Sequence, residues 1–335
     1  MQEEGIVINL EGIKEDNEEI KSFRTYSNYL LSLKQYIEYK YGKRPEVFVN
    51  LKTACEEKPS YSKFQTNKDA DLDKIKKLLF NSWHTEIVFC IPRKTSEEFV
   101  KYSNHWAPIQ AYYSIFLSIR ALFDSMGIVC PHSHADTLQQ ISESIVNRDL
   151  FPSPWNSYCR GQKELNNHSY FNFLGEYKEI SNLSTPFLVD FWSWYALWLK
   201  TTRERKDKKR RKEAIKSKRF KCANGEPRKN LSFKQKLIVD STLHATTFYD
   251  GLYRLRIRSN YEDADAFILG TMSQEEALTF YDSLIVILEA TLFVLEKCIS
   301  KHISSQEYKN IVDEFIRSVG EDMAKDTVAL RKDYY

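Results

Sequence analysis

The sequence predicts a mainly α-helical protein, and three features support this prediction. Among 335 residues there are only ten glycines and nine prolines, whereas tyrosine and phenylalanine each occur twenty times, so few tight turns are expected. Hydrophobic residues make up 42% of the chain and recur at intervals of three and four over several long segments. Two of these segments are preceded by a capping-box pattern, Asp16 with Glu19 and Ser273 with Glu276. We therefore expect a globular helical fold with little strand.

The N-terminal region, residues 1–98, is predicted to be an extension with helices and one strand. A helix is expected over residues 16–41, where apolar residues share one face and Gly42 follows the last of them. A shorter helix is expected over residues 71–83. Residues 86–91, which precede Pro92, are apolar and partly β-branched, and this pattern predicts a strand.

Two helices and a long insertion are predicted next. Pro108 suits a first helical turn, and apolar residues then line one face as far as Gly127. A second helix is expected over residues 135–146. Residues 151–230 are rich first in Asn, Ser and Pro and then in Lys and Arg, which predicts an insertion between bundle helices. Insertions of this size usually carry function or a partner surface.

The C-terminal part of the chain predicts two further helices and a tail. Ser232 is expected to cap a long helix that runs through Leu255, with His244 on its apolar stripe. The last bundle helix should run from Gln274 to about Ile299. Because this helix is apolar on most of its circumference, we expect it to be buried between neighbours or in a homodimer with the helix around Tyr112. Residues 301–335 are expected to form a helical tail.

Positive charge is concentrated in residues 200–219, which hold 12 Lys or Arg and 3 acids, a local charge of +9. The whole chain carries +3, so the remainder carries 3 − 9 = −6. Such a run can neutralise phosphates, or it can be a solvated helix or linker with no specific partner. The RNA-binding candidates are Arg203, Arg205, Lys208, Lys209, Arg210, Arg211 and Arg254.

Several function classes are not expected from the composition. The six cysteines show no CxxC pair, and we expect reduced, neutral thiols, no metal site and no cofactor.

Residues 187–199 form a dense aromatic run of 13 residues, which is short of the roughly 20 that cross a bilayer. We therefore expect a core helix, and the alternative is that Trp192, Trp194 and Trp198 anchor a protein partner. The acidic start shows no export signal, which predicts a cytoplasmic protein.

Two segments together resemble a known family. Residues 111–123 read AYYSIFLSIRALF and are followed by Gly127 and the sequence His132-Ser133-His134. Residues 255–261 read LRIRSNY and are followed by the capped helix at Ser273. This pair resembles HEPN domains, which are helical bundles common in prokaryotic toxin–antitoxin and phage-defence proteins. The resemblance covers residues 103–149 and 236–300, and it implies an antiparallel helical bundle over residues 99–300 and a role with RNA.

The resemblance also implies a site. Ribonucleolytic HEPN proteins have an arginine followed four to six residues later by a histidine, usually contributed twice by a dimer, and they cleave RNA without metal. Arg256 matches the arginine, with Arg258 beside it, but Tyr261 stands where the histidine is expected. A tyrosine with a pKa of about 10 is a poor general base at neutral pH. A histidine would have to come from His105, His132, His134 or His244, and sequence spacing places none of them.

Two functions therefore stay open. One is a HEPN-like endoribonuclease or toxin effector in which Arg256, Arg258 and Tyr261 form the catalytic site. The other is a non-catalytic module that binds a nucleotide or a protein partner, for example a nucleotidyltransferase that modifies a tyrosine. A purely structural role is the third reading, in which Arg256 pairs with an acid, namely Glu262, Asp263 or Asp265.

Overall fold

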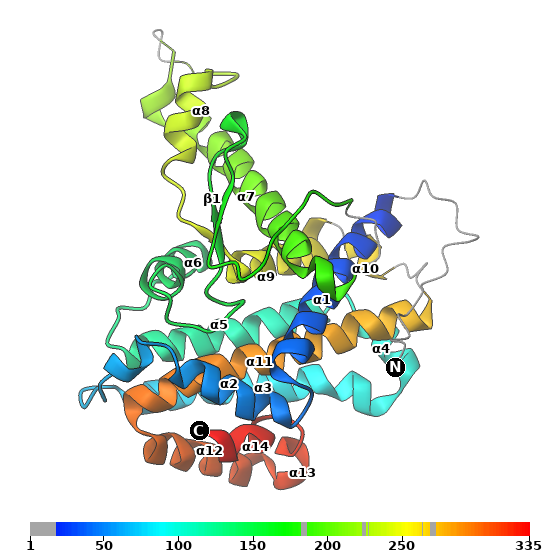
Figure 1. Ribbon diagram of the computed structural model, residues 1–335, viewed down its shortest axis with the longest axis vertical. Helices are drawn as coiled ribbons and strands as arrows, with labels where there is room; N and C mark the ends of the chain where they lie inside the picture. Colours follow the sequence, from blue (N-terminus) through cyan, green and yellow to red (C-terminus); the bar gives the residue numbers. More distant parts are fainter. Residues whose placement is uncertain (1–17, 182–185, 223–225, 227, 263, 269–272) are drawn as a thin grey trace.

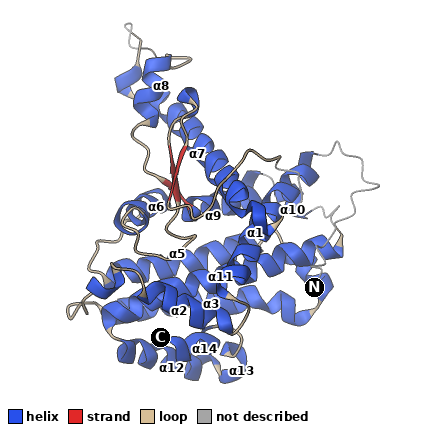
Figure 2. Ribbon diagram, in the orientation of Figure 1, coloured by secondary structure: helices blue, strands red, loops and turns tan. Residues whose placement is uncertain are grey.

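The computed structural model describes residues 18–181, 186–222, 226, 228–262, 264–268 and 273–335. In these ranges the protein is mainly α-helical with one three-stranded sheet, as the sequence predicts (Figure 2). A helical body carries a narrower projection that contains most of α7 (Phe191–Lys216) and all of α8 (Phe233–Asp240) (Figure 1). The first predicted cap, Asp16, lies outside the described residues.

The central helix of the body is α11 (Gln274–Ile303), which begins at the predicted capping box on Ser273. It packs against α1 (Glu18–Tyr41), α2 (Glu46–Glu56), α4 (Glu97–Ser103) and α5 (Ala107–Ser125), and α3 (Leu72–Thr95) runs along α5. By length and composition α11 is the one described helix that could cross a membrane, but 72% of its most apolar window is buried inside the fold. Tyr112 and Leu284 are both buried as well. Neighbouring helices of the same chain therefore bury most of α11, which is one of the two predicted arrangements, and the homodimer stays a prediction.

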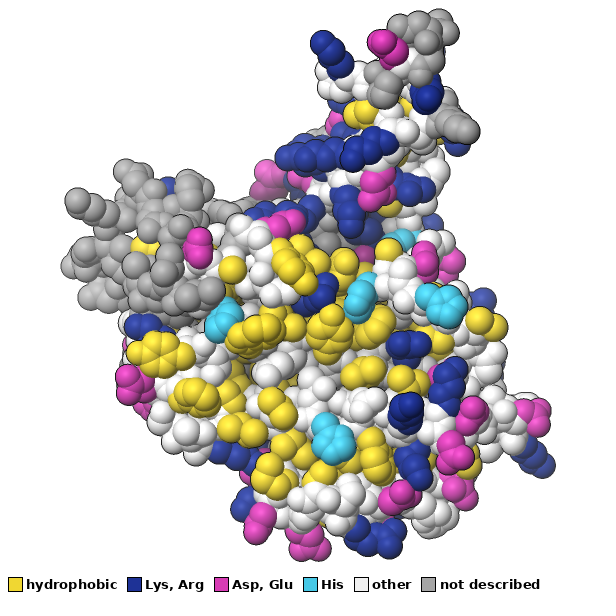
Figure 3. Space-filling view, turned by 180° about the vertical axis from the view of Figure 1, so that it is seen from behind, with side chains coloured by type: hydrophobic (Ala, Val, Ile, Leu, Met, Phe, Trp, Pro, Cys, Tyr) yellow, Lys and Arg dark blue, Asp and Glu magenta, His cyan; other side chains and the backbone are white. Residues whose placement is uncertain are grey.

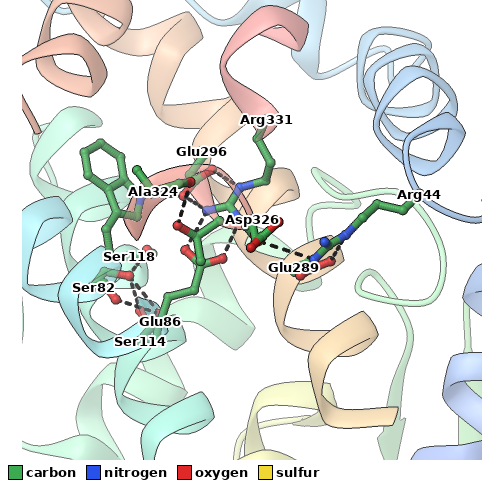
Figure 4. Close-up of polar contacts among 12 residues, drawn as sticks. Arg44, Ser82, Glu86, Ser114, Ser118, Glu289, Glu296, Ala324, Asp326 and Arg331 are labelled. Atoms are coloured by element: carbon green, nitrogen blue, oxygen red, sulfur yellow. Dashed lines mark hydrogen bonds and ion pairs between the residues drawn. The ribbon is translucent and has the colours of Figure 1, made fainter. Parts of the chain in front are cut away.

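The C-terminal residues are part of the same core. They form α12 (Ser305–Val319), α13 (Glu321–Ala324) and α14 (Val328–Arg331). Arg331 is 1% exposed and lies between the buried carboxylates of Glu86 on α3 and Glu296 on α11 (Figure 4). Its Nη2 donates to both acids, at 2.9 Å each, and Trp83 donates to Glu296 at 2.7 Å. One hydrophobic cluster runs from Phe23 to Tyr335, so residues 98 and 300 do not divide the core.

The insertion contributes two strands to a small antiparallel sheet of order β2-β1-β3. Its strands are β1 (Tyr158–Arg160), β2 (Ser169–Phe171) and β3 (Thr246–Thr247). Because β3 leads directly into α9 (Phe248–Ile257), the sheet joins the projection to the body. On the body side lie α6 (His134–Ile141) with the π-helical turn Ser142–Val146, and the π-helical turn Arg258–Glu262 with α10 (Ala264–Ile268). Short 3-10 helices span Tyr61–Lys63, Lys163–Leu165, Leu188–Asp190, Lys218–Phe220 and Lys332–Tyr334.

Two sequence predictions are wrong. Residues 86–91 are helical within α3, not a strand, and Pro92 is accommodated near the end of that helix. Glu86, Ile87, Phe89 and Cys90 are buried in a helical core, and this packing overrides a weak strand propensity. The long helix predicted from Ser232 is broken, because α8 ends at Asp240 and a loop through His244 precedes β3. His244 is therefore a loop residue.

The aromatic run at the start of α7 is a core segment, as the sequence favours. Trp194 and Trp198 are each 1% exposed, and Trp192 is buried too. The ring of Trp198 stacks with that of Tyr29 at 5.9 Å between centroids, which fixes α7 against α1. The tryptophans are therefore not exposed anchors for a partner.

Candidate functional site

Arg256 lies at the centre of a group of aromatic side chains. Its guanidinium carbon is 5.2 Å from the ring centre of Tyr113, 5.8 Å from those of Tyr253 and Tyr261, and 5.9 Å from that of Tyr112. Its Nη2 donates a hydrogen bond to the Tyr113 hydroxyl at 2.8 Å. These four tyrosines, called the tyrosine cage here, come from α5, α9 and the π-helical turn that follows α9. Arg256 is 9% exposed, and Tyr261 is 68% exposed.

His134 lies against the same cage. Its ring centre is 5.5 Å from that of Tyr112, 5.7 Å from that of Tyr253 and 5.8 Å from that of Tyr113. Its Nδ1 is hydrogen-bonded to the Tyr112 hydroxyl at 2.9 Å, so Nε2 is the nitrogen left for a ligand. Burial, with a smaller contribution from the Arg256 charge, lowers the pKa of His134. Both effects favour the neutral form of the ring.

The position of His134 follows from a local signal and a long-range one. Ser133 caps α6, since its hydroxyl accepts a hydrogen bond from the Asp136 amide at 3.1 Å, and this cap makes His134 the first residue of the helix. Sequence spacing cannot place His134 next to Arg256, because their approach depends on how α6 and α9 pack on α5. His132 is exposed, and the structure brings neither His105 nor His244 into ring contact with the cage.

No described carboxylate forms an ion pair with Arg256. Glu262 pairs with Arg205 and, at 3.2 Å, with Arg258. Asp265 makes no ion pair with Arg256, and Asp263 lies outside the described residues. Within the described part of the chain, the Arg256 charge is therefore met by aromatic ring faces and a hydroxyl group.

A cleft of about 450 Å³ adjoins the tyrosine cage, between α6, α7, α9 and the loop at residues 242–244. Four residues of α9 line it, spaced as on one helix face: Asp250, Tyr253, Arg254 and Ile257. Tyr253 belongs to both the cage and the cleft. The volume falls within the range of about 300 to 1,000 Å³ that is typical of ligand sites.

One wall of the cleft contains a buried cluster of titratable groups. Lys206 Nζ donates to Asp250 Oδ1 at 2.7 Å and lies 2.8 Å from His244 Nε2. Although burial opposes ionisation of Asp250, Lys206 and His244 hold the pKa of that carboxyl well below its usual range. Asp250 also accepts a hydrogen bond from the Thr247 amide at 2.8 Å, which caps α9. This cluster fixes the start of α9.

The basic run divides into an inner and an outer face of α7. Arg203 is 3% exposed and donates to the backbone carbonyls of Gly161 and His244, the first at 3.1 Å. Arg211 pairs with Glu164 at 2.7 Å and with Asp240, and Arg205 pairs with Glu262. These three arginines make contacts within the protein, and their role in RNA binding stays a prediction.

Lys208, Lys209 and Arg210 are exposed on the outer face, as is Lys212. Figure 3 shows Lys and Arg side chains gathered on the projection. Arg254, the remaining RNA-binding candidate, lies in the cleft wall. Residues 203, 207 and 211 share the inner face because they are four apart. Asp207 within the basic run is the sequence signal for this buried side.

Replacing Asp207 by asparagine should stabilise the protein at neutral pH. Burial, and then the nearby Asp240, raise the pKa of Asp207 to about 6 from the ordinary 3.8. A folded-state pKa above the unfolded one lowers stability as the pH rises from about 4 to 6. We expect Asp207→Asn to gain about 2 kcal/mol at pH 7 and almost nothing at pH 4. Urea denaturation at both pH values measures this, and an equal effect at both would contradict it.

The described residues contain no group of three or more His, Cys, Asp or Glu placed to hold a metal ion. No protein-family model, curated protein or solved structure matches this chain. The resemblance to HEPN domains therefore depends on the two sequence segments described above.

Proposed function

We propose that this protein is a HEPN-like, RNA-directed protein of prokaryotic defence or toxin–antitoxin type, acting in the cytoplasm as an endoribonuclease, with Arg256 and His134 as its central pair. One observation supports this most: Arg256 and His134 contact the same three tyrosine rings. A cation for the phosphate and an imidazole for proton transfer thus lie against one aromatic cluster, beside a cleft and a basic helix face. A histidine from α6 would then do what the missing histidine near Arg256 does elsewhere in the family.

The proposed reaction is cleavage by the RNA's own 2′-hydroxyl. His134 Nε2 accepts the 2′-hydroxyl proton while the 2′-oxygen forms a bond to phosphorus and the bond to the 5′-oxygen breaks. The leaving 5′-oxygen takes a proton from solvent water, His134 afterwards releases its proton to solvent, and a 2′,3′-cyclic phosphate remains on the other fragment. Arg256 stabilises the charge that develops on the phosphate oxygens. Tyr261, whose exposed ring lies 5.8 Å from the Arg256 guanidinium carbon, moves aside when the phosphate enters.

Replacing His134 by glutamine should abolish cleavage and leave the fold intact. Glutamine keeps a polar side chain at the first position of α6 but does not transfer protons near pH 7. Because the pKa of His134 is lowered, the wild-type rate should rise with pH to a plateau, with a midpoint below the ordinary histidine value of 6.5. Gel assays of a labelled RNA between pH 4.5 and 8 measure this. His132→Gln, at an exposed position two residues earlier, is the matched control and should remain fully active.

The outer face of α7 should supply most of the salt-dependent attraction to RNA. Replacing Lys208, Lys209 and Lys212 by serine should lower the slope of log affinity against log salt by about 2, because each phosphate contact on a single strand contributes about 0.7. The control variant replaces Lys63, Lys68 and Lys77, which are exposed on the body, and removes the same charge. Filter binding at several salt concentrations measures the slope for each variant. Equal slopes for both variants would show that the outer face does not contact RNA.

A non-catalytic module that binds a nucleotide or protein partner is the second candidate. It is favoured by the low exposure of Arg256, 9%, together with the high exposure of Tyr261, 68%. In this case Tyr261 presents its hydroxyl to a partner enzyme and Arg256 only supports the cage. RNA binding without cleavage by the purified wild type would favour this candidate.

The homodimer also remains a proposal, now with the exposed Val88, Phe99 and Trp106 on the body as its candidate surface.

A further inference from the structure

The cleft beside the tyrosine cage contains an arginine that lacks an anionic partner among the described residues. Arg254 Nη1 donates to the hydroxyls of Thr201 at 2.7 Å and Thr202 at 3.2 Å, and the guanidinium lies 5.5 Å from the ring centre of Tyr26. These contacts fix the side chain from one side. Its Nε is buried and has no hydrogen-bond acceptor. No described carboxylate pairs with this guanidinium, although burial of an unpaired charge is costly.

The free edge of Arg254 suits one kind of ligand. Its threonine contacts use Nη1, so Nε and Nη2 form the edge that has no described acceptor. Two parallel N–H groups on one edge of a guanidinium match two oxygens of a phosphate or carboxylate. Arg254 is therefore held in position for an anion that arrives through the cleft.

The other charges of the cleft largely cancel. Lys206 pairs with Asp250, Arg205 with Glu262, and Arg210 with Glu213 at 3.7 Å. Lys209 is exposed at the cleft and has no ion pair with a described acid. Asp136, which caps the first turn of α6 with Ser133, is the remaining acid. Arg254 and Lys209 thus leave a net positive charge in the cleft.

The cleft also offers a flat aromatic wall. Tyr253 lines it and stacks on His134 with ring centres 5.7 Å apart and planes 26° from parallel. A nucleobase can stack on such a wall, and stacking of a base on an aromatic side chain is largely independent of sequence. Thr202 and Thr242 line the cleft as well and carry hydroxyl groups for polar contacts with a sugar or base.

We propose that this cleft binds one nucleoside phosphate, with Arg254 and Lys209 on the phosphate and Tyr253 against the base. The nucleoside phosphate is either a free nucleotide or the end of an RNA strand, since both present the same groups. Neither Arg256 nor His134 is needed for this binding, so the proposal is independent of RNA cleavage and of the function proposed above.

Calorimetry on the 335-residue chain tests the proposal. The probes are the four nucleoside 5′-monophosphates, the four nucleosides, and a short 2′-O-methyl RNA with and without a 5′-phosphate. We expect at least one monophosphate or the phosphorylated strand to bind at least tenfold more tightly than its counterpart without phosphate. Tighter binding of the strand than of any mononucleotide would assign the site to RNA, and the reverse would assign it to a free nucleotide. Absence of binding by every phosphorylated probe would overturn the proposal.

Variants locate the binding in the cleft. Arg254→Gln should weaken binding at least tenfold, and Lys209→Gln should weaken it severalfold. Arg219→Gln, at an exposed position elsewhere on the projection, is the matched control and should bind as the wild type does. If Arg254→Gln does not fold, Arg254→Lys, which keeps the charge but loses the two-donor edge, replaces it with the same expectation. His134→Gln should retain binding even where it abolishes cleavage. Unchanged affinity in folded Arg254 and Lys209 variants would contradict the assignment.

Discussion

Replacing Arg331 by methionine is expected to destabilise the protein by about 3 to 5 kcal/mol at pH 7. Arg331 is 1% exposed, and the side chains of Glu86 and Glu296 are not exposed at all. Burial raises the pKa of Glu86, and the Arg331 charge opposes that rise. Removal of the arginine would leave two carboxylates in the core without their cation. Chemical denaturation monitored by tryptophan fluorescence measures the loss.

Two further variants show whether the loss comes from buried charge. Arg93→Met breaks an exposed ion pair with Asp282, at 3.0 Å, and should cost less than about 1 kcal/mol. Adding Glu86→Gln and Glu296→Gln to Arg331→Met should recover part of the stability, because the uncompensated charges are then gone. A stability near that of the wild type in Arg331→Met alone would show that the C-terminal segment does not hold α3 and α11 together.

Replacing Arg256 by alanine should lower the rate of RNA cleavage at least about 100-fold, because the charge on the phosphate in the transition state loses its cation. The cost in stability should be about 1 to 2 kcal/mol, from the lost contacts with the tyrosine rings and the Tyr113 hydroxyl. A larger cost, typical of a broken buried ion pair, is not expected, because no described acid is left unpaired. Cleavage assays and denaturation curves on the same purified variant give both values.

A variant with similar stability loss provides the control. Val312→Ala removes buried side-chain volume in α12, which packs against α11, α13 and α14. It should cost about 1 to 3 kcal/mol while cleavage is retained. Arg256→Lys keeps the charge but not the planar two-donor geometry, so its activity should lie between those of alanine and arginine. Full activity in a folded Arg256→Ala variant would contradict a role for Arg256 in cleavage.

The helices that the sequence predicts well carry local signals. The capping box at Ser273 and a continuous apolar face place the start of α11 at Gln274, as predicted, and Pro108 with Gly127 bounds α5 closely. The strand predicted at residues 86–91 fails because the deciding contacts are not local. Glu86 is buried against Arg331, which is 245 residues away in the sequence. The strand propensity of six residues contains no information about that contact.

In the candidate site too, residues close in sequence could be predicted, and residues brought together by helix packing could not. Arg256 and Tyr261 are close in sequence, so the family pattern identifies both and the structure places them together. His134, Tyr112 and Tyr113 join them only through the packing of three helices, which spacing does not reveal. The side chains of Arg203 and Arg211 point into the protein because their carbonyl and carboxylate partners come from distant parts of the chain. In the sequence, only Asp207 indicates that this face of α7 is buried.

Analysis of the RNA ends produced by the wild type and by His134→Gln tests the central claim most directly. We expect that the wild type leaves a 2′,3′-cyclic phosphate and a 5′-hydroxyl, that a 2′-O-methyl substrate is not cut, and that His134→Gln produces neither end. Cleavage of the 2′-O-methyl substrate, or equal cleavage by His134→Gln, would contradict it.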